Sequence, residues 1–374
     1  MKNLFTSLFL FLLIMLFEMP VQAQSVDQQI MDHLFNAELV QADSLINVEI
    51  NKYQNHPKYY FMKAHYNFYM RYFTTQPFDR DSILQVIIDN GEKAVSFEDD
   101  IEETTENKFY LGSAYGLLCR AYIMKQELWD GYWAADNCED YLKEVLDEDP
   151  NFADAYVGLG VIEYYTGRLT GFQSFLAWLG GVSGDTETGL QYFKKAAENG
   201  RTLKNEANFI LATMYRFLEN DFTQATIYLK SLNEKFPNNG FIDNLFRQTQ
   251  IVQLIEEKGI EYLKSNIEDL RNDYRITNSN VLNTLGYNYL GQQRYELAIA
   301  IFELNISLYP DQANPYDSIS ECYQVQGNRV KAIEYAKIGL RKLPADSTIN
   351  EQFRQRLKEI MENRLKDLGN VIET

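Results

Sequence analysis

The chain has 374 residues, of which 45% are hydrophobic and 14% aromatic, and its formal net charge is −18 with a pI near 4.7. Such an acidic chain repels nucleic-acid phosphates and anionic lipid headgroups, so we expect neither a nucleic-acid partner nor electrostatic docking on a membrane. The hydrophobic share is ordinary for a globular protein.

Residues 1–23 have the pattern of a secretory signal peptide. Lys2 precedes an apolar run at residues 4–17, and a small-residue cleavage site ends at Ala23. The run is shorter than the roughly 20 apolar residues that a membrane span needs. We therefore expect cleavage after Ala23 and an exported, periplasmic protein that could associate with the envelope. An uncleaved anchor is the alternative.

Residues 24–150 show apolar side chains at helical spacing, interrupted by turn residues, which predicts degenerate helix pairs. The expected helices of the first pairs cover residues 26–35, 37–53 and 58–73, and a further helix opens after Asp79. A new pair restarts the pattern at Leu111 and ends at Pro150.

Residues 151–240 continue the pattern with an insertion. A first helix is expected at 151–167, but its partner is delayed until 185–199, which leaves residues 168–184 between them. The insertion carries several large apolar residues between glycines, among them Phe172, Phe175, Leu176, Trp178 and Leu179. It is either a binding patch for a partner or a peripheral membrane contact, or a structural plug folded back on the helices.

Residues 241–346 contain the clearest internal repeat. A weak pair at 241–257 and 259–271 precedes two strong copies at 279–345, and residues 347–374 read as a polar capping helix and a tail. The two strong copies match at a 34-residue period, as shown by Leu285, Gly286, Tyr289, Ala298, Phe302 and Pro310 against Ile319, Ser320, Tyr323, Ala332, Ala336 and Pro344.

A 34-residue period with small, aromatic and proline residues in these positions resembles the tetratricopeptide repeat (TPR) family. The resemblance implies an all-α, right-handed TPR solenoid of about six to seven helix pairs with a C-terminal capping helix. Each pair would contact only its neighbours, and the stack would expose a concave surface that binds a partner. The middle block, with Gly158, Gly160, Gly184 and Gly189, further resembles the inclusion-body-clearance type of TPR protein and its bacterial relatives.

The TPR resemblance also implies which residues face the groove, namely the second, fifth, ninth and twelfth residues of each first helix. In the strong repeats these include Asn280, Asn283 and Tyr287, then Asp317, Glu321 and Gln324. The same register predicts an aromatic path upstream, formed by Tyr59, Tyr66, Tyr69, Tyr164 and Phe217. The alternative for each of these rings is that it fills a helix interface.

The chain carries little that indicates catalysis. Its three histidines, His33, His56 and His65, form no metal-binding pair, and no phosphate loop or nucleophile elbow is present. We expect no enzyme activity, no cofactor and no metal site. Cys119 and Cys138 lie at similar distances from an expected turn and could form a disulfide, although both could equally be small buried residues.

These patterns predict a non-catalytic scaffold or adaptor of the cell envelope. It would hold an extended peptide or a partner protein in its concave groove, through slots whose residues are neutral to acidic and therefore suit a polar or basic peptide. The alternative is a protein that binds a glycan or another small molecule through the tyrosine-lined groove.

Overall fold

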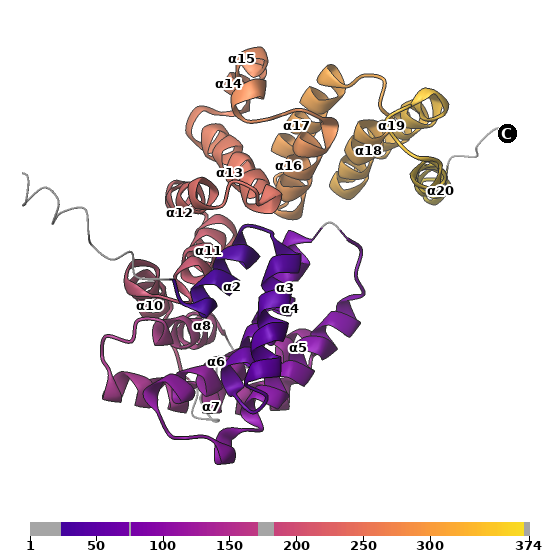
Figure 1. Cartoon of the computed structure of the whole chain (residues 1–374). Coiled ribbons are helices and arrows are strands. Elements are labelled where there is room, and N and C mark those ends of the chain that lie inside the picture. The colour runs from indigo at the N-terminus through magenta and orange to yellow at the C-terminus, as the bar shows by residue number, and fades with distance from the viewer. Residues whose placement is uncertain (1–23, 75, 171–182, 370–374) are drawn as a thin grey trace, which may run out of the picture. The chain divides into compact units, whose positions relative to one another are not determined.

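A computed structural model describes residues 24–74, 76–170 and 183–369. The described residues form helices and their connections, without strands (Figure 1). The predicted signal peptide at 1–23 and the apolar residues of the insertion from Phe172 to Leu179 lie outside the described residues.

The described chain divides into two compact units. Unit 1 extends to Leu211 and includes Glu234–Phe241, and unit 2 comprises Ala212–Asn233 and the chain from Ile242 onward. The division falls inside one helix, α11 (Lys204–Met214).

Unit 1 contains four helix pairs, and the two helices of each pair pack against each other. They are α2 (Val26–Phe35) with α3 (Leu39–Lys52), α4 (Pro57–Phe73) with α5 (Arg80–Val95), α6 (Thr105–Lys125) with α7 (Leu128–Glu148), and α8 (Ala155–Gly167) with α10 (Thr186–Asn199). The start of α11 follows them.

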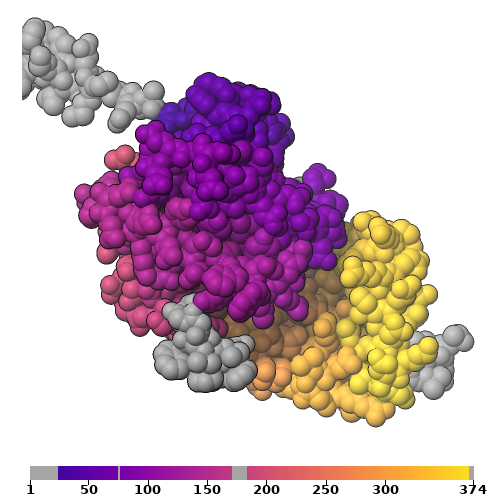
Figure 2. Space-filling model, turned by 90° about the horizontal axis from the view of Figure 1, so that it is seen from below, coloured from indigo at the N-terminus to yellow at the C-terminus, as the bar shows by residue number. Residues whose placement is uncertain are grey.

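Unit 2 holds the strong repeats and the cap. Its helices are α12 (Phe222–Lys235, in this unit up to Asn233), α13 (Gly240–Lys258), α14 (Ile260–Ser265), α15 (Ile267–Asp273), α16 (Ser279–Gly291), α17 (Tyr295–Leu308), α18 (Asn314–Gln326), α19 (Arg329–Lys342) and α20 (Glu351–Asp367). Helix α16 pairs with α17 and α18 with α19, and α20 packs on α19. The last helices, drawn yellow, form a continuous surface in Figure 2.

Local sequence explains many of the helix ends. Ser25 and Gln28 form a capping box at the start of α2, and the Asp185 side chain accepts from the Thr188 amide at the start of α10. Pro57 occupies the first turn of α4, where its missing N–H costs nothing. At the end of α18, Gly327 adopts φ +87°, a left-handed conformation that favours glycine.

The predicted helices agree with the structure except in the weak pair. We expected one helix at 259–271, but the chain forms α14 and α15 with a break at Asn266. The Asn266 side chain donates to the Tyr262 carbonyl oxygen over 2.8 Å, and such side-chain bonding competes with the helical ladder.

Unit 1 departs from a simple solenoid, in which each pair contacts only its neighbours. Its first helices α2 and α4 also contact α11 and the segment after α12, which follow them by more than 130 residues. Asn205 donates to Asp32 over 3.0 Å, and Asn239 donates to the Phe35 carbonyl oxygen over 2.9 Å. The first pair therefore closes onto the last helix of the unit.

An apolar cluster of aromatic rings lies where unit 1 closes. Phe35 contacts Tyr69, Phe73, Phe209 and Phe236 at ring-centroid distances from 5.5 to 6.2 Å. Rings at these distances stabilise beyond the area they bury. These aromatic side chains therefore pack against one another in the core of unit 1.

Candidate functional site

The predicted tyrosine path does not form an open groove in unit 1. Tyr69 is 2% exposed and Tyr164 is fully buried, while Tyr59 is buried and stacks on Tyr53 with ring centroids 5.5 Å apart. Tyr66 is half-buried beside Lys63. Tyr59, Tyr69 and Tyr164 therefore fill helix interfaces, which was the alternative for each of them, and Tyr66 is only partly covered.

Phe217, the remaining ring of the predicted path, belongs to unit 2 and is 53% exposed. It lies in a short π-helical turn, Tyr215–Glu219, that follows α11. The Arg216 guanidinium lies over its ring, 5.2 Å from the centroid. The tyrosines of the predicted path lie in unit 1.

Tyr69 instead belongs to a buried polar cluster whose members are far apart in the sequence. The cluster centres on Glu206 of α11, whose carboxylate accepts from the Tyr69 hydroxyl over 2.9 Å and from Arg120 over 3.0 Å. His65 Nε2 lies 2.7 Å from the second oxygen. Helices α4, α6 and α11 thus meet at one carboxylate.

The electrostatics of this cluster favour the charged form of Glu206. Burial alone would raise the pKa of Glu206, but the charges and hydrogen bonds of His65 and Arg120 outweigh it and lower that pKa to about 2. Burial also raises the pKa of Tyr69, next to the carboxylate. Glu206, His65 and Tyr69 are buried and Arg120 is partly exposed, so the cluster joins three helices in the interior of unit 1.

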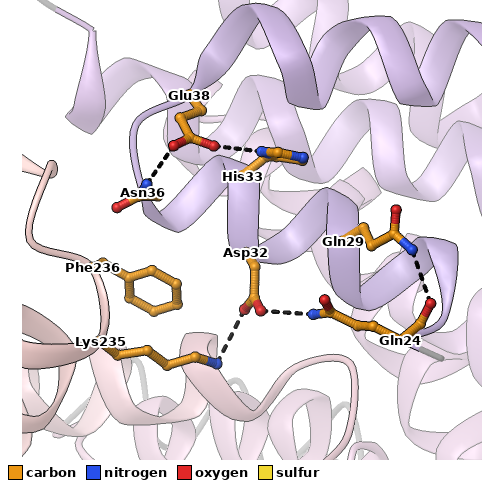
Figure 3. Close-up of a pocket in the computed structure, with 8 residues that line it drawn as sticks. All are labelled: Gln24, Gln29, Asp32, His33, Asn36, Glu38, Lys235 and Phe236. Atoms are coloured by element: carbon orange, nitrogen blue, oxygen red, sulfur yellow. Dashed lines mark hydrogen bonds and ion pairs between the residues drawn. The ribbon is translucent and has the colours of Figure 1, made fainter. Parts of the chain in front are cut away.

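A surface pocket of about 240 Å³ lies beside α2, between the first pair and the segment after α12 (Figure 3). Its polar groups pair with one another: Asp32 lies 3.1 Å from Lys235 Nζ and accepts from Gln24 over 2.7 Å. Glu38 bonds His33 Nδ1 at 2.5 Å, and this bond lowers the pKa of Glu38. The pocket therefore lies at the surface where the first helix pair contacts Lys235 and Phe236.

Cys119 and Cys138 are free thiols in the structure, so the disulfide that we considered is not present. Both are buried, and Cys138 Sγ lies against the helix backbone at Gly116 and Gly158. Both behave as small apolar residues at the contact of α6, α7 and α8, as in the alternative reading.

An exposed apolar patch on α6 and α7 was also missed. Trp129 is 70% exposed and Leu128 68%, and Trp133 and Ile123 are about half exposed. Trp129 and Trp133 lie one helical turn apart on α7, so their spacing could have revealed the patch.

In unit 2 two of the predicted slot residues contact each other, and the slot residues differ in exposure. Asn280 is exposed, while Asn283, Tyr287 and Glu321 are half-buried. The Tyr287 hydroxyl donates to Glu321 over 2.8 Å and so joins α16 to α18. The 34-residue register therefore brings these two residues of neighbouring repeats into contact.

Asp317, the fourth residue of α18, is buried rather than open to a ligand. Arg364 of α20 forms an ion pair with it and donates to Gln324 over 3.0 Å. Burial raises the pKa of Asp317, although the positive charge of Arg364 acts in the opposite direction. The sequence predicts α20 as a cap, but its pattern does not indicate that Arg364 of this helix contacts groove residues of α18.

Two further observations concern the whole described chain. Residues 24–74, 76–170 and 183–369 contain no helix that is long and apolar enough to cross a membrane. The same residues contain no group of three His, Cys, Asp or Glu side chains placed to hold a metal ion.

The consecutive pairing of helices and the 34-residue spacing of α16 and α17 to α18 and α19 decide the architecture. The chain has a TPR fold. No protein-family model and no curated protein matches it.

The solved structures that are similar to this chain are distant. The P58(IPK) TPR domain is 13% identical, with 88% of this chain and 94% of that chain covered and a TM-score of 0.25. A human IFIT1 dimer with PPP-AAAA is 15% identical, with 83% of this chain and 70% of that chain covered and a TM-score of 0.34. Yeast Tom70 is 12% identical, with 91% of this chain and 83% of that chain covered and a TM-score of 0.26. The narrower resemblance of the middle block stays a prediction.

Proposed function

We propose that this protein is a non-catalytic adaptor that binds a polypeptide along the first helices of unit 2. The observation that carries the proposal is the hydrogen bond between Tyr287 of α16 and Glu321 of α18, which joins polar groove residues across the repeat boundary over 2.8 Å. Polar side chains held by their own hydrogen bonds are pre-organised, and this lowers the entropy cost of binding an extended chain.

The alternative of a glycan-binding protein loses its main support. It rested on a tyrosine-lined groove, and Tyr59, Tyr69 and Tyr164 are buried. Polypeptide binding requires only the α16 and α18 surface, so it is the function that we propose.

We further propose that the protein acts in the cell envelope after export. This proposal rests on the pattern of residues 1–23. Fractionation of cells, with mass spectrometry of the mature N-terminus, tests it: we expect a periplasmic or envelope-associated chain that begins at Gln24. A cytoplasmic chain that retains Met1 would overturn this part of the proposal.

Site-specific photo-crosslinking tests the binding surface. A photoreactive residue replaces the exposed Asn280 of α16 in the full chain, and a matched control places it at Val330 of α19, which is 77% exposed. We expect polypeptide adducts from position 280 and not from position 330 in envelope extracts. Equal labelling at both positions, or none at 280, would contradict the proposed function.

A further inference from the structure

The guanidinium of Arg364, on α20, lies among the predicted groove residues of α18. Arg364 is 6% exposed, and its Nη1 forms an ion pair with Asp317 Oδ1 and donates to the Asp317 carbonyl oxygen over 3.2 Å. Its Nε donates to Gln324 Oε1 over 3.0 Å, and Nη2 lies 3.6 Å from Glu321 Oε2. Three of the four groove positions of α18 therefore surround one arginine side chain.

The capping helix is also attached by apolar contacts. Helix α20 already buries Leu357, Met361 and Leu365 almost completely, and this apolar face is what shields the end of a repeat array. A buried ion pair adds little to such a contact, because removing both charges from water costs about as much as their attraction returns. The acceptors of α18 are instead arranged as a fixed site for a planar cation.

The acceptors continue onto α16. Glu321 is 40% exposed at its side chain and accepts from Tyr287 over 2.8 Å. Asn283 stands at the same repeat position as Asp317, and its side-chain oxygen is buried with no hydrogen-bond partner among the described residues. A buried acceptor without a donor costs free energy, which a bound N–H group would recover.

We propose that this row of acceptors, Asn283, Asp317, Glu321 and Gln324, binds an extended polypeptide through an arginine side chain, and that Arg364 is an internal occupant that the arginine of the partner replaces. The proposal rests on the proposed function and adds the chemistry of the partner. The overall charge of −18 favours the approach of a basic segment.

A peptide-binding measurement on the full chain tests the proposal. The probe is a fluorescein-labelled glycine–serine peptide with two arginines, and its matched control carries citrulline, which has the shape of arginine without the charge. R364Q empties the slot, whereas R356Q removes the same charge from an exposed position of the same helix. Fluorescence anisotropy measures the affinity of each variant for the arginine peptide and for the citrulline peptide.

We expect R364Q to bind the arginine peptide about tenfold more tightly than R356Q, because the internal competitor is gone. Adding D317N to R364Q should abolish this gain, whereas adding the exposed-site change E359Q should not. Equal affinity of R364Q and R356Q for the arginine peptide would overturn the proposal.

A second measurement covers the case in which R364Q unfolds α20. Millimolar methylguanidinium should raise the Tm of R364A but not that of R356A, because the ion fills the vacated slot. No difference between the two variants would also overturn the proposal.

The citrulline peptide separates this inference from the proposed function. If R364Q binds the arginine and citrulline peptides equally, the arginine-specific slot is wrong and polypeptide binding stands. If the photo-crosslinker at position 280 labels nothing, the proposed function itself fails.

Discussion

His65 Nε2 lies 2.7 Å from Glu206 Oε2, although the two residues are 141 positions apart in the chain. This contact joins the second helix pair of unit 1 to its last helix, α11. It shows that unit 1 is closed by contacts between repeats that are far apart in the sequence.

Replacement of Glu206 by Gln should destabilise unit 1. The change leaves Arg120 buried without its carboxylate, and breaking one partner of a buried ion pair costs about 3–5 kcal/mol. Urea unfolding followed by circular dichroism measures the loss. Glu198→Gln, at an exposed position, is the matched control. Equal free energies of unfolding for the two variants would show that the cluster is not a stabilising contact.

The stability of unit 1 should fall in acid because of the same carboxylate. The pKa of Glu206 is lowered from 4.5 to about 2 on folding, so the folded state binds the proton less well than the unfolded state. The resulting stability is fully present above pH 4.5 and is lost as the pH falls toward 2. The free energy of unfolding of the wild type should therefore decline over this window more than that of E206Q. Parallel pH profiles would contradict the assignment.

The three cysteines should react slowly in the native protein. All are buried, and burial raises the pKa of Cys119 and of Cys322 to about 11 and that of Cys138 further. Thiolate is the reactive form, so little of it exists near neutral pH. We expect mass spectrometry to detect three alkylated thiols only after urea is added. Rapid native alkylation, or a mass two hydrogens lower without reductant, would disagree with the structure.

Gly286→Ala should destabilise unit 2 by about 1–3 kcal/mol through overpacking. A Cβ atom built at this position would lie 2.4 Å from the ring of Phe302, which is fully buried and cannot move into solvent. Gly291→Ala is the control, because nothing lies within 4 Å of its added Cβ. Thermal unfolding should separate the two variants. A similar Tm for both would show that α16 and α17 can move apart without cost.

The fold could be predicted from the sequence because repeat signals are local. Leu285, Gly286 and Tyr289 recur as Ile319, Ser320 and Tyr323, and a helix pair is specified by such spacing within 34 residues. Tyr287 and Glu321, which occupy the same position in adjacent repeats, form a hydrogen bond in the structure, and their place on a binding groove stays a prediction. The helix at 259–271 was wrong, because the side-chain bond of Asn266 is not visible in apolar periodicity.

The sequence by itself determined the helices and their pairing, except at residues 259–271, where the chain forms two short helices. Only the tertiary structure decided which faces are open. Tyr69 lies on the predicted face of α4, yet α11 covers it, and Asp317 lies on the predicted face of α18, yet Arg364 occupies it. The physical reason is that helical spacing depends on residues a few positions apart, whereas burial depends on segments that approach from distant parts of the chain.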